Sequence, residues 1–387
     1  MADILAFGKY NVAELSNAEI FWRDHYNFLK ERGYTLRKRY DPTWVPSWLN
    51  TTKSSRECED GHRIPYGQAL DATRADGTLV VLKRLDLDKH AHEISIIRHL
   101  TSVAFPSNPR NHCIPVVEII DSPEGSHIAF VIMPLLLKVD SPPFETIGEA
   151  VWFCKQIFEG LNYLHENNIV HGDCKSDNIM ADSLCLFDSP PHPANRSMKR
   201  DYSESHTLKS IQYYFIDFGL SKIYRLEDAP VLEQPPWGGD KTVPEHLIPN
   251  PPPCDPFAVD IYCLGNFLRQ YFLDVHQGLD GVTTRPPPQG FEFLRELVTD
   301  MVNTDPLRRP RMSEVVSHFD AIVLGLKNRK LCSPFICTGN QLGIFATAIH
   351  WSKQLFRTAR GIPAIPTCTT NVRTFINHVS LSKCHEP

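Results

Sequence analysis

The sequence predicts an α+β fold in which a smaller, antiparallel β-rich part precedes a larger, mainly helical part. Four strand-like runs lie in the first third of the chain, at residues 68–73, 78–84, 116–120 and 127–133. The dipeptide Asp76-Gly77 separates the first two runs, as in a tight turn between antiparallel strands. Later segments carry apolar residues at helical spacing, at residues 146–167, 291–303 and 313–326. A chain of 387 residues with 42% hydrophobic content can bury a substantial core.

An N-terminal extension, residues 1–59, precedes the first of these strands. Within it, residues 14–33 indicate a helix that Ser16 or Asn17 caps and Gly33 ends. The aromatic face of this helix needs cover. We expect it to pack on the β-rich part, and a partner-binding surface is the alternative.

Two motifs place polar and charged side chains beside buried strand patterns. The first, VHGDCKSDNIM at residues 170–180, carries Asp173, Lys175 and Asn178 on one loop. The second, YYFIDFG, places Asp217 at the end of an apolar run. Phosphoryl transfer needs such a set, because one carboxylate orients the attacking hydroxyl, a cation steadies the moving phosphate, and an amide and a carboxylate hold Mg²⁺.

These motifs resemble the catalytic loop and the D-F-G segment of the eukaryotic protein kinases. The resemblance implies a two-lobed fold, with a small antiparallel β lobe and one main helix at residues 60–136 and a larger, mainly helical lobe at residues 137–330. It also implies a nucleotide-binding pair. Lys83, at a strand end, would hold the nucleotide phosphates, and Glu93, on the helix near residues 90–101, would orient Lys83.

Two more residues have structural roles by the same resemblance. Asp260 lies on a helix that begins at Asp255-Pro256, with Asp as N-cap and Pro in the first turn, and it braces the backbone of the catalytic loop. Arg309 pairs with Glu245, which follows Val243-Pro244 where the family usually has Ala-Pro.

More narrowly, four short segments resemble those of a family of kinase-like proteins from mushroom-forming fungi. The segments are FWRDHY at residues 21–26, WVPSW at 44–48, VIMPLL at 131–136 and YYFIDFG at 213–219.

The resemblance implies ATP and Mg²⁺ as cofactors, with Asn178 and Asp217 as the metal ligands. Met133, Pro134 and Leu136 belong to the hinge, where backbone groups recognise adenine and Pro134 offers only its carbonyl.

The glycine-rich loop that covers the phosphates is poor in this chain. Gly67 remains from it, but His62 and Ile64 stand at its other two glycine positions, and Gly61 is one position away. Because glycine allows the backbone to approach phosphates closely, we expect this cover to be weakened.

Gly172 stands where the kinase family usually has an Arg that pairs with a phosphate on the activation segment. That segment contains Ser221 and Thr242, but Gly238 occupies the position of its usual hydroxyl residue. We therefore expect no activation by phosphorylation of this segment.

These residues predict an ATP-dependent protein serine/threonine kinase. Asp173 would orient the acceptor hydroxyl and accept its proton, and Lys175 would steady the γ-phosphate. A pseudokinase that binds nucleotide and acts as a scaffold is the alternative that the poor glycine loop favours. A small-molecule kinase of the aminoglycoside or choline type shares the H-G-D motif, but Lys175, Glu245 and Asp260 favour the protein kinase.

Composition narrows the remaining classes. The net charge of −5 makes no case for nucleic acid binding. The sequence contains no run of 18 apolar residues, so it predicts no transmembrane helix. Residues 1–10 lack the pattern of a signal peptide. The 11 Cys show no C-x-x-C pair, which favours free thiols in a reducing compartment. We expect an intracellular, cytoplasmic protein with a nuclear location left open, and protein substrates and ATP as partners; the oligomeric state stays open.

Two segments lie outside the family pattern. An insert at about 184–210 separates Asn178 from Asp217, and we interpret it as a surface loop in a hairpin, with a docking role as the alternative. Residues 331–387 contain a single acid, Glu386, and we expect a loosely ordered tail, with binding to a membrane surface as the alternative.

Overall fold

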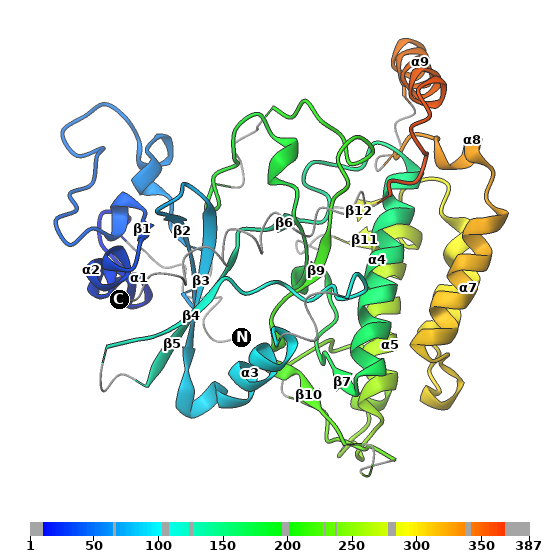
Figure 1. The fold of residues 1–387 in the computed structure, drawn as a ribbon, viewed down its shortest axis with the longest axis horizontal. Helices are drawn as coiled ribbons and strands as arrows, with labels where there is room; N and C mark the ends of the chain where they lie inside the picture. The colour runs from blue at the N-terminus through cyan, green and yellow to red at the C-terminus, as the bar shows by residue number, and fades with distance from the viewer. Residues whose placement is uncertain are drawn as a thin grey trace, which may run out of the picture. The chain divides into compact units, whose positions relative to one another are not determined.

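A computed structural model describes residues 11–64, 67–102, 108–123, 127–195, 201–225, 227, 230–236, 238–277, 284–336 and 342–367. The chain divides into two compact units. The first comprises Met1–Ala91, Pro115–Leu135 and Ser189–Arg200, and the second comprises His92–Ile114, Leu136–Asp188 and Asp201–Pro387. The first unit contains the main sheet and the second most of the helices (Figure 1), so the predicted two-lobed α+β fold class is confirmed.

A five-stranded antiparallel sheet in the order β1-β2-β3-β5-β4 forms the frame of the first unit. Its strands are β1 (Tyr34–Leu36), β2 (Ala69–Arg74), β3 (Leu79–Asp86), β4 (Glu118–Asp121) and β5 (Ile128–Pro134). The four predicted strands are therefore present, each within two residues of its expected start. Gly77 in the turn between β2 and β3 has φ of +86°, which glycine adopts without strain.

Two short helices, α1 (Asn17–Asp24) and α2 (Tyr26–Glu31), stand where the sequence predicted one. The break falls at His25, whose imidazole contacts the Phe21 carbonyl at 2.8 Å and the Ser122 hydroxyl at 3.2 Å. The aromatic face of these helices is buried in one core with the sheet, formed by Trp22, Tyr26, Leu29, Leu82 and Phe130 among others.

A buried ion pair ties α1 to the segment after β1. Arg39 is fully buried, and its Nε lies 2.7 Å from Glu19 Oε1. Its remaining N–H groups donate to the carbonyls of Val12, Glu14 and Asp60. The second carboxylate oxygen of Glu19 accepts from Arg63 at 2.8 Å. Because both charges are paired and hydrogen-bonded, they can be buried at a tolerable cost in free energy.

Helix α3 (Leu87–Leu100) spans the division between the units. His90 interrupts it with φ of −122° and ψ of 23°, and the division follows Ala91. The second unit then contains the α-helices α4 (Ile147–Glu166), α5 (Pro256–Leu268), α6 (Arg295–Met301), α7 (Met312–Gly325), α8 (Asn328–Leu331) and α9 (Ile344–Ala359).

Three small sheets complete the second unit. Their strands are β6 (Leu137–Lys138), β8 (Ile179–Ala181) and β9 (Tyr213–Phe215) in the first, β7 (Ile169–Val170) and β10 (Lys222–Ile223) in the second, and β11 (His276–Gln277) and β12 (Thr284–Arg285) in the third. Every pairing in them is antiparallel.

Helix α4 begins at the predicted Thr146, but only half of the predicted capping box forms. The Thr146 hydroxyl accepts from the Glu149 N–H at 3.2 Å. The Glu149 carboxylate instead accepts from the Glu145 N–H and from Thr207, which ends the insert region. Glu149 thus fastens the returning end of the insert to α4.

The insert connects the paired strands β8 and β9, and part of it belongs to the first unit. There His192 Nε2 lies 3.1 Å from Glu59 Oε1, and Asn195 contacts the His62 ring at 3.0 Å. Residues 196–200 lie outside the described part.

The structure differs from the expected loose tail over residues 342–367, where α9 forms. Arg357 and Lys353 both pair with Glu145 at 2.9 Å, and a Cβ at Gly148 would lie 2.0 Å from the Ala364 carbonyl. The expectation of a loose tail rested on the lack of acids within the tail. The acid that pairs with its basic residues is Glu145, in the segment before α4. Residues 368–387 lie outside the described part.

Within the described part of the chain, no helix is both long enough and apolar enough to cross a membrane.

Replacing Glu19 with Ala should destabilise the protein by about 3–5 kcal/mol, because Arg39 would remain buried without its counter-charge. Urea unfolding followed by tryptophan fluorescence measures the loss. Asp24→Ala on the same helix is the control, since its pair with Arg23 is exposed and should be worth no more than about 1 kcal/mol. Equal losses in the two variants would contradict the role of the buried pair.

Acid should remove the advantage of this pair. Burial raises the pKa of Glu19, but hydrogen bonds from Arg39 and Arg63 outweigh burial and hold the pKa below its usual 4.5. The pair therefore contributes stability above pH 4.5, and this contribution is lost as the pH falls through the lowered pKa. We expect the difference in unfolding free energy between wild type and Glu19→Ala to narrow below pH 4.5; a difference that stays constant in acid would contradict this.

Candidate active site

The loop between β7 and β8 brings three of the predicted site residues together. Asn178, at the end of the 3₁₀ helix Ser176–Asn178, donates from Nδ2 to Asp173 Oδ2 at 2.8 Å and to the Asp173 carbonyl at 3.0 Å. Lys175 Nζ lies 2.7 Å from the same Oδ2. Burial lowers the pKa of Lys175, but the hydrogen bond and charge of Asp173 outweigh burial and raise it overall, so Lys175 is a cation here.

Among the described residues, no donor reaches the other oxygen of the Asp173 carboxylate. Asp173 is only 7% exposed, and its Oδ1 is buried without a hydrogen-bond partner among the described residues. Buried carboxylate oxygens are normally paired, and an unpaired one costs free energy. The loop therefore holds one acceptor of a charged group ready for a donor from outside the loop.

The Asp260 carboxylate of α5 holds the start of this loop through hydrogen bonds to its backbone. Its carboxylate is fully buried and accepts from the N–H of His171 at 2.7 Å and of Gly172 at 2.8 Å. His165 Nε2 lies 3.1 Å from the same group. The bracing role expected for Asp260 is confirmed. Burial and the nearby Asp260 charge also raise the pKa of the Cys174 thiol well above its usual value, so that thiol is not a nucleophile.

His171 connects the catalytic loop to the segment before Asp217. Burial lowers the pKa of His171 overall, so the ring is neutral. Its Nδ1 accepts from the Asp173 N–H at 3.2 Å, which leaves Nε2 to donate to the Ile216 carbonyl at 3.1 Å. The Ile216 N–H in turn donates to the Asn178 carbonyl at 3.0 Å. Two separate hydrogen bonds thus set Asp217 beside the loop.

Asp217 has a left-handed backbone, with φ of 64° and ψ of 78°, where the 3₁₀ helix Phe218–Leu220 begins. A non-glycine residue in this region is strained, and such strain occurs often at functional sites. A Cβ at Gly219 would lie 3.4 Å from Asp217 Oδ1 and 3.5 Å from Glu93 Oε2, so both carboxylates border Gly219. His92 Nε2 also contacts the Gly219 carbonyl at 2.7 Å. Glu93 is 2% exposed.

The donor atoms at Asn178 and Asp217 suit Mg²⁺. Both side chains offer hard oxygen ligands, and Mg²⁺ is usually bound by one or two protein oxygens together with phosphates and waters. The Asn178 NH₂ group donates to Asp173, so its amide oxygen is the atom that can coordinate a cation. No cluster of three or more His, Cys, Asp or Glu side chains that could hold a metal occurs among the described residues.

Arg309 and Glu245 form the predicted pair. Arg309 Nη1 and Nη2 each donate to one carboxylate oxygen of Glu245 at 2.7 Å, and the Arg309 side chain is fully buried. The guanidinium also donates to the carbonyls of Asn303 and Ala258. This two-point pair fixes the end of the segment after D-F-G against α5.

Gly172 proves to be a position that only glycine fits. Its φ is +80°, and a Cβ there would lie 2.5 Å from the Leu220 carbonyl oxygen. Gly238 and Gly239 pack into the same place, since a Cβ at Gly238 would meet the Leu220 side chain at 2.7 Å and one at Gly239 the Gly172 carbonyl at 3.3 Å. The missing Arg is therefore replaced by close glycine packing.

The predicted residues of the first unit stand on the sheet. Lys83 lies on β3 opposite Val131 of β5, and Met133 and Pro134 end β5. The Leu135 N–H donates to the Leu79 carbonyl at 3.2 Å. Leu136, which is 6% exposed, begins the second unit. The contact between Lys83 and Glu93, and the adenine-binding role of the hinge, stay predictions.

The glycines near the expected phosphate loop are occupied by packing. A Cβ at Gly67 would lie 2.6 Å from the Ala18 side chain of α1, and the Gly67 carbonyl accepts from Trp22 Nε1 at 3.2 Å. A Cβ at Gly61 would meet the Ser55 carbonyl at 1.8 Å. Their small size thus serves the N-terminal extension, and a phosphate-binding role for Gly67 stays a prediction. Residues 65 and 66 lie outside the described part.

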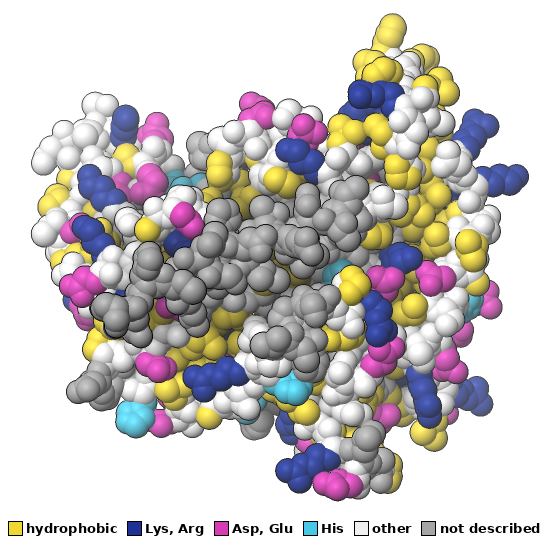
Figure 2. Space-filling view, in the orientation of Figure 1, with side chains coloured by type: hydrophobic (Ala, Val, Ile, Leu, Met, Phe, Trp, Pro, Cys, Tyr) yellow, Lys and Arg dark blue, Asp and Glu magenta, His cyan; other side chains and the backbone are white. Residues whose placement is uncertain are grey.

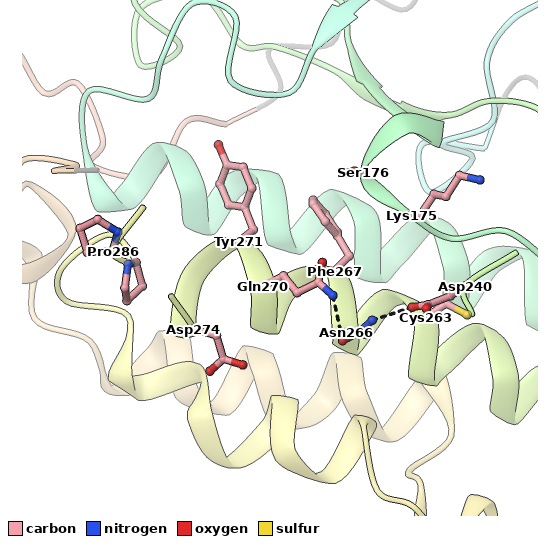
Figure 3. A pocket seen from close by; sticks show the side chains of 11 residues that line it. Lys175, Ser176, Asp240, Cys263, Asn266, Phe267, Gln270, Tyr271, Asp274 and Pro286 are labelled. Carbon is pink, nitrogen blue, oxygen red and sulfur yellow. Dashed lines mark hydrogen bonds between the residues drawn. The ribbon is translucent and has the colours of Figure 1, made fainter. Parts of the chain in front are cut away.

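A cavity of about 390 Å³ opens beside the catalytic loop (Figure 3). It is lined by Lys175, Ser176, Asp240, Cys263, Asn266, Phe267, Gln270, Tyr271, Asp274, Pro286 and Pro287. Asn266 donates to Asp240 at 2.6 Å, and the Tyr271 hydroxyl donates to Asp140 at 3.0 Å. Apart from Lys175 and Ser176 of the catalytic loop, sequence reasoning missed the residues that line this cavity, because they gather from one helix face and two further loops without any motif.

Comparisons with known proteins agree with the fold class of the chain. The family model described as protein kinase domain matches residues 65–319. The chain is 28% identical over 232 residues to the light-sensor protein kinase of Ceratodon purpureus, which covers 56% of this chain and 17% of that protein. It is 27% identical over 221 residues to the serine/threonine-protein kinase GRIK2 of Arabidopsis thaliana, covering 52% and 47%.

A third relative is the SNF1-related protein kinase catalytic subunit alpha KIN12 of Arabidopsis thaliana. The identity is 24% over 266 residues, which covers 64% of this chain and 46% of that protein. The chain thus spans less than half the length of each of these three relatives.

Gly172→Ala should impair both folding and activity. The positive φ alone costs about 1–2 kcal/mol for a residue with a Cβ, and the contact with the Leu220 carbonyl adds to it. Because the backbone of Asp173 would shift, we expect a loss of about tenfold to a hundredfold in phosphate transfer. Gly77→Ala is the matched control, since Gly77 has φ of +86° but nothing within 4 Å of its Cβ position. Equal effects of the two variants on activity would refute the role of the glycine contact.

Proposed function

The chain belongs to the protein kinase domain family, and on that premise we propose that it transfers the γ-phosphate of ATP to Ser and Thr hydroxyls of proteins. The observation that supports this best is the Oδ1 of Asp173, which has no hydrogen-bond partner among the described residues. A carboxylate held by Asn178 and Lys175 through one oxygen can accept the proton of a hydroxyl through the other.

The neighbouring side chains fit the remaining tasks. Lys175 is a cation within reach of the Asp173 carboxylate and would steady the phosphoryl group as it leaves the nucleotide. Asn178 and Asp217 would hold Mg²⁺, which when bound neutralises charge on the phosphate oxygens. Lys83, oriented by Glu93, would hold the nucleotide phosphates, and backbone groups from Met133 to Leu136 would recognise adenine.

The cavity beside Lys175 is where we propose that the acceptor segment lies. It adjoins the catalytic loop and presents amide, hydroxyl and carboxylate groups, which suit an extended polypeptide better than a bare phosphate. Asp240 lines this cavity and accepts hydrogen bonds from Thr242 and Asn266.

A second candidate function is a scaffold with weak or no catalysis. The packing of Gly61 and Gly67 against other segments favours it, because neither glycine then approaches a phosphate. The small-molecule kinase alternative lacks such support, since Asp260 and the pair of Arg309 with Glu245 form the framework expected of protein kinases.

Two finer proposals concern the setting. The eight cysteines within the described ranges are free thiols, which supports a reducing, intracellular compartment. The likeness to the kinase-like proteins of mushroom-forming fungi stays a proposal that rests on the four short segments at residues 21–26, 44–48, 131–136 and 213–219 alone.

Asp173→Asn should abolish phosphate transfer, with a loss of at least about a hundredfold, because an amide cannot accept the hydroxyl proton. The assay is incorporation of labelled phosphate from Mg·ATP into a generic protein substrate. Asp177→Asn is the matched control, since Asp177 is an exposed acid on the same loop and should retain activity. Wild-type protein that transfers no phosphate would contradict the kinase proposal.

Thermal shift separates the kinase from the scaffold. Mg·ATP should raise the unfolding temperature of wild type and of Asp173→Asn alike, because the substituted residue faces the acceptor hydroxyl. Stabilisation without transfer in the wild type would favour the nucleotide-binding scaffold.

A further inference from the structure

Helix α9 is attached to the protein by the opposite face from the one expected of an amphipathic helix. Its buried side chains are polar: His350 contacts the Cys332 carbonyl at 2.8 Å, and Arg357 donates to Glu145 at 2.9 Å and Ser205 at 2.8 Å. Gln354 lies between them and is 5% exposed. Amphipathic helices on soluble domains normally bury their apolar stripe.

The apolar stripe of α9 faces solvent instead. Five large side chains along it are more than half exposed, namely Ile344 at 87%, Phe345 at 86%, Ile349 at 69%, Leu355 at 70% and Phe356 at 61%. At 3.6 residues per turn they fall within one half of the helix circumference. Figure 2 shows hydrophobic side chains gathered over α9. A contiguous apolar patch of this kind marks a binding surface.

Basic side chains border the stripe. Lys353 is exposed, and the Arg360 guanidinium lies 5.4 Å from the Phe356 ring centroid. Across the helix, Arg329 of α8 lies 5.9 Å from the Trp351 ring centroid. Residues 342–367 contain no acid, and Lys353 and Arg357 both pair with Glu145. The rim of the stripe is therefore positively charged, with a Trp at its edge.

From this arrangement we propose that α9 docks the protein on an anionic lipid surface. Helices that lie in the membrane interface combine an apolar face with a basic rim, and Trp favours the boundary between acyl chains and headgroups. Charge complementarity favours anionic lipid over a neutral surface. At 16 residues, and with one polar face held by the protein, α9 lies on the bilayer and does not cross it.

The anchoring of α9 makes this surface rigid. Its polar face is fixed by Glu145 and Cys332, and the segment after it packs on Gly148 at the start of α4. The proposed docking therefore requires no folding on contact, and it is independent of the catalytic proposal.

The test uses the full chain and cosedimentation with phosphatidylcholine vesicles, with and without phosphatidylserine. We expect binding to the mixed vesicles that falls with added salt, and little binding to phosphatidylcholine alone. The double variant Phe345→Asp/Ile349→Asp should lose binding at least tenfold while keeping phosphate transfer in solution. Leu307→Asp is the matched control, because Leu307 is 93% exposed but lies outside α9 and should leave binding unchanged.

A charge variant tests the lipid class. Arg360→Glu should weaken binding to the mixed vesicles by about fivefold or more, since each basic residue near an anionic surface contributes to that extent, whereas Arg225→Glu on another exposed segment should not. Two results would overturn the proposal. One is equal binding of the double variant and the wild type. The other is a wild-type dimer in analytical ultracentrifugation that the double variant abolishes, which would show that a second copy covers the stripe.

Discussion

The buried carboxylate of Asp260 is the interaction on which the rest of the candidate site depends. Two backbone N–H groups of the catalytic loop converge on it, so the loop leaves β7 in one direction only. A carboxylate without access to water needs such donors, and the N–H groups in turn would be unpaired without the carboxylate. This mutual requirement fixes Gly172, and Gly172 fixes the position of Asp173 one residue later.

From that point the site extends by hydrogen bonds with little freedom. Asp173 is held by Asn178 and Lys175, His171 reaches the carbonyl before Asp217, and the Asn178 carbonyl accepts from Ile216. The groups that we propose for phosphate transfer are thus held in place by the protein's own hydrogen bonds. Such preorganisation supplies most of the acceleration in phosphoryl transfer, where little covalent chemistry is left to the protein.

The chain adds its own devices to this shared frame. Helix α1 packs against Gly67, the one glycine that remains of the expected phosphate loop, and the ion pair of Glu19 with Arg39 ties α1 to the segment after β1. The glycines at 172, 238 and 239 pack together where the family places an Arg and a phosphate. Helix α9 presents an apolar face outward.

The sequence by itself determined the fold class, the strands and helices of the frame, and the identity of the residues on the catalytic loop. Through the resemblance of its motifs to those of the protein kinases, it also predicted the roles of Asp260 and of Arg309 with Glu245. The roles of Lys83, Glu93, Gly67 and the hinge residues remain predictions. Hydrophobic periodicity, helix caps and short motifs are local patterns, and they predicted the features that depend on neighbouring residues in the sequence.

The remaining features could not be predicted from local patterns, because they depend on which distant segments of the chain meet in the tertiary structure. The predicted N-terminal helix is interrupted at His25, whose imidazole contacts Ser122. The Glu149 carboxylate accepts from Thr207 and does not complete the predicted capping box. In the sequence, Gly172 stands where an Arg is usual. In the structure, the Leu220 carbonyl leaves no room for a side chain at this position. Helix α9 of the tail is held by Glu145, an acid that lies outside the tail. Because Lys353 and Arg357 pair with Glu145, the apolar face of α9 points away from this contact.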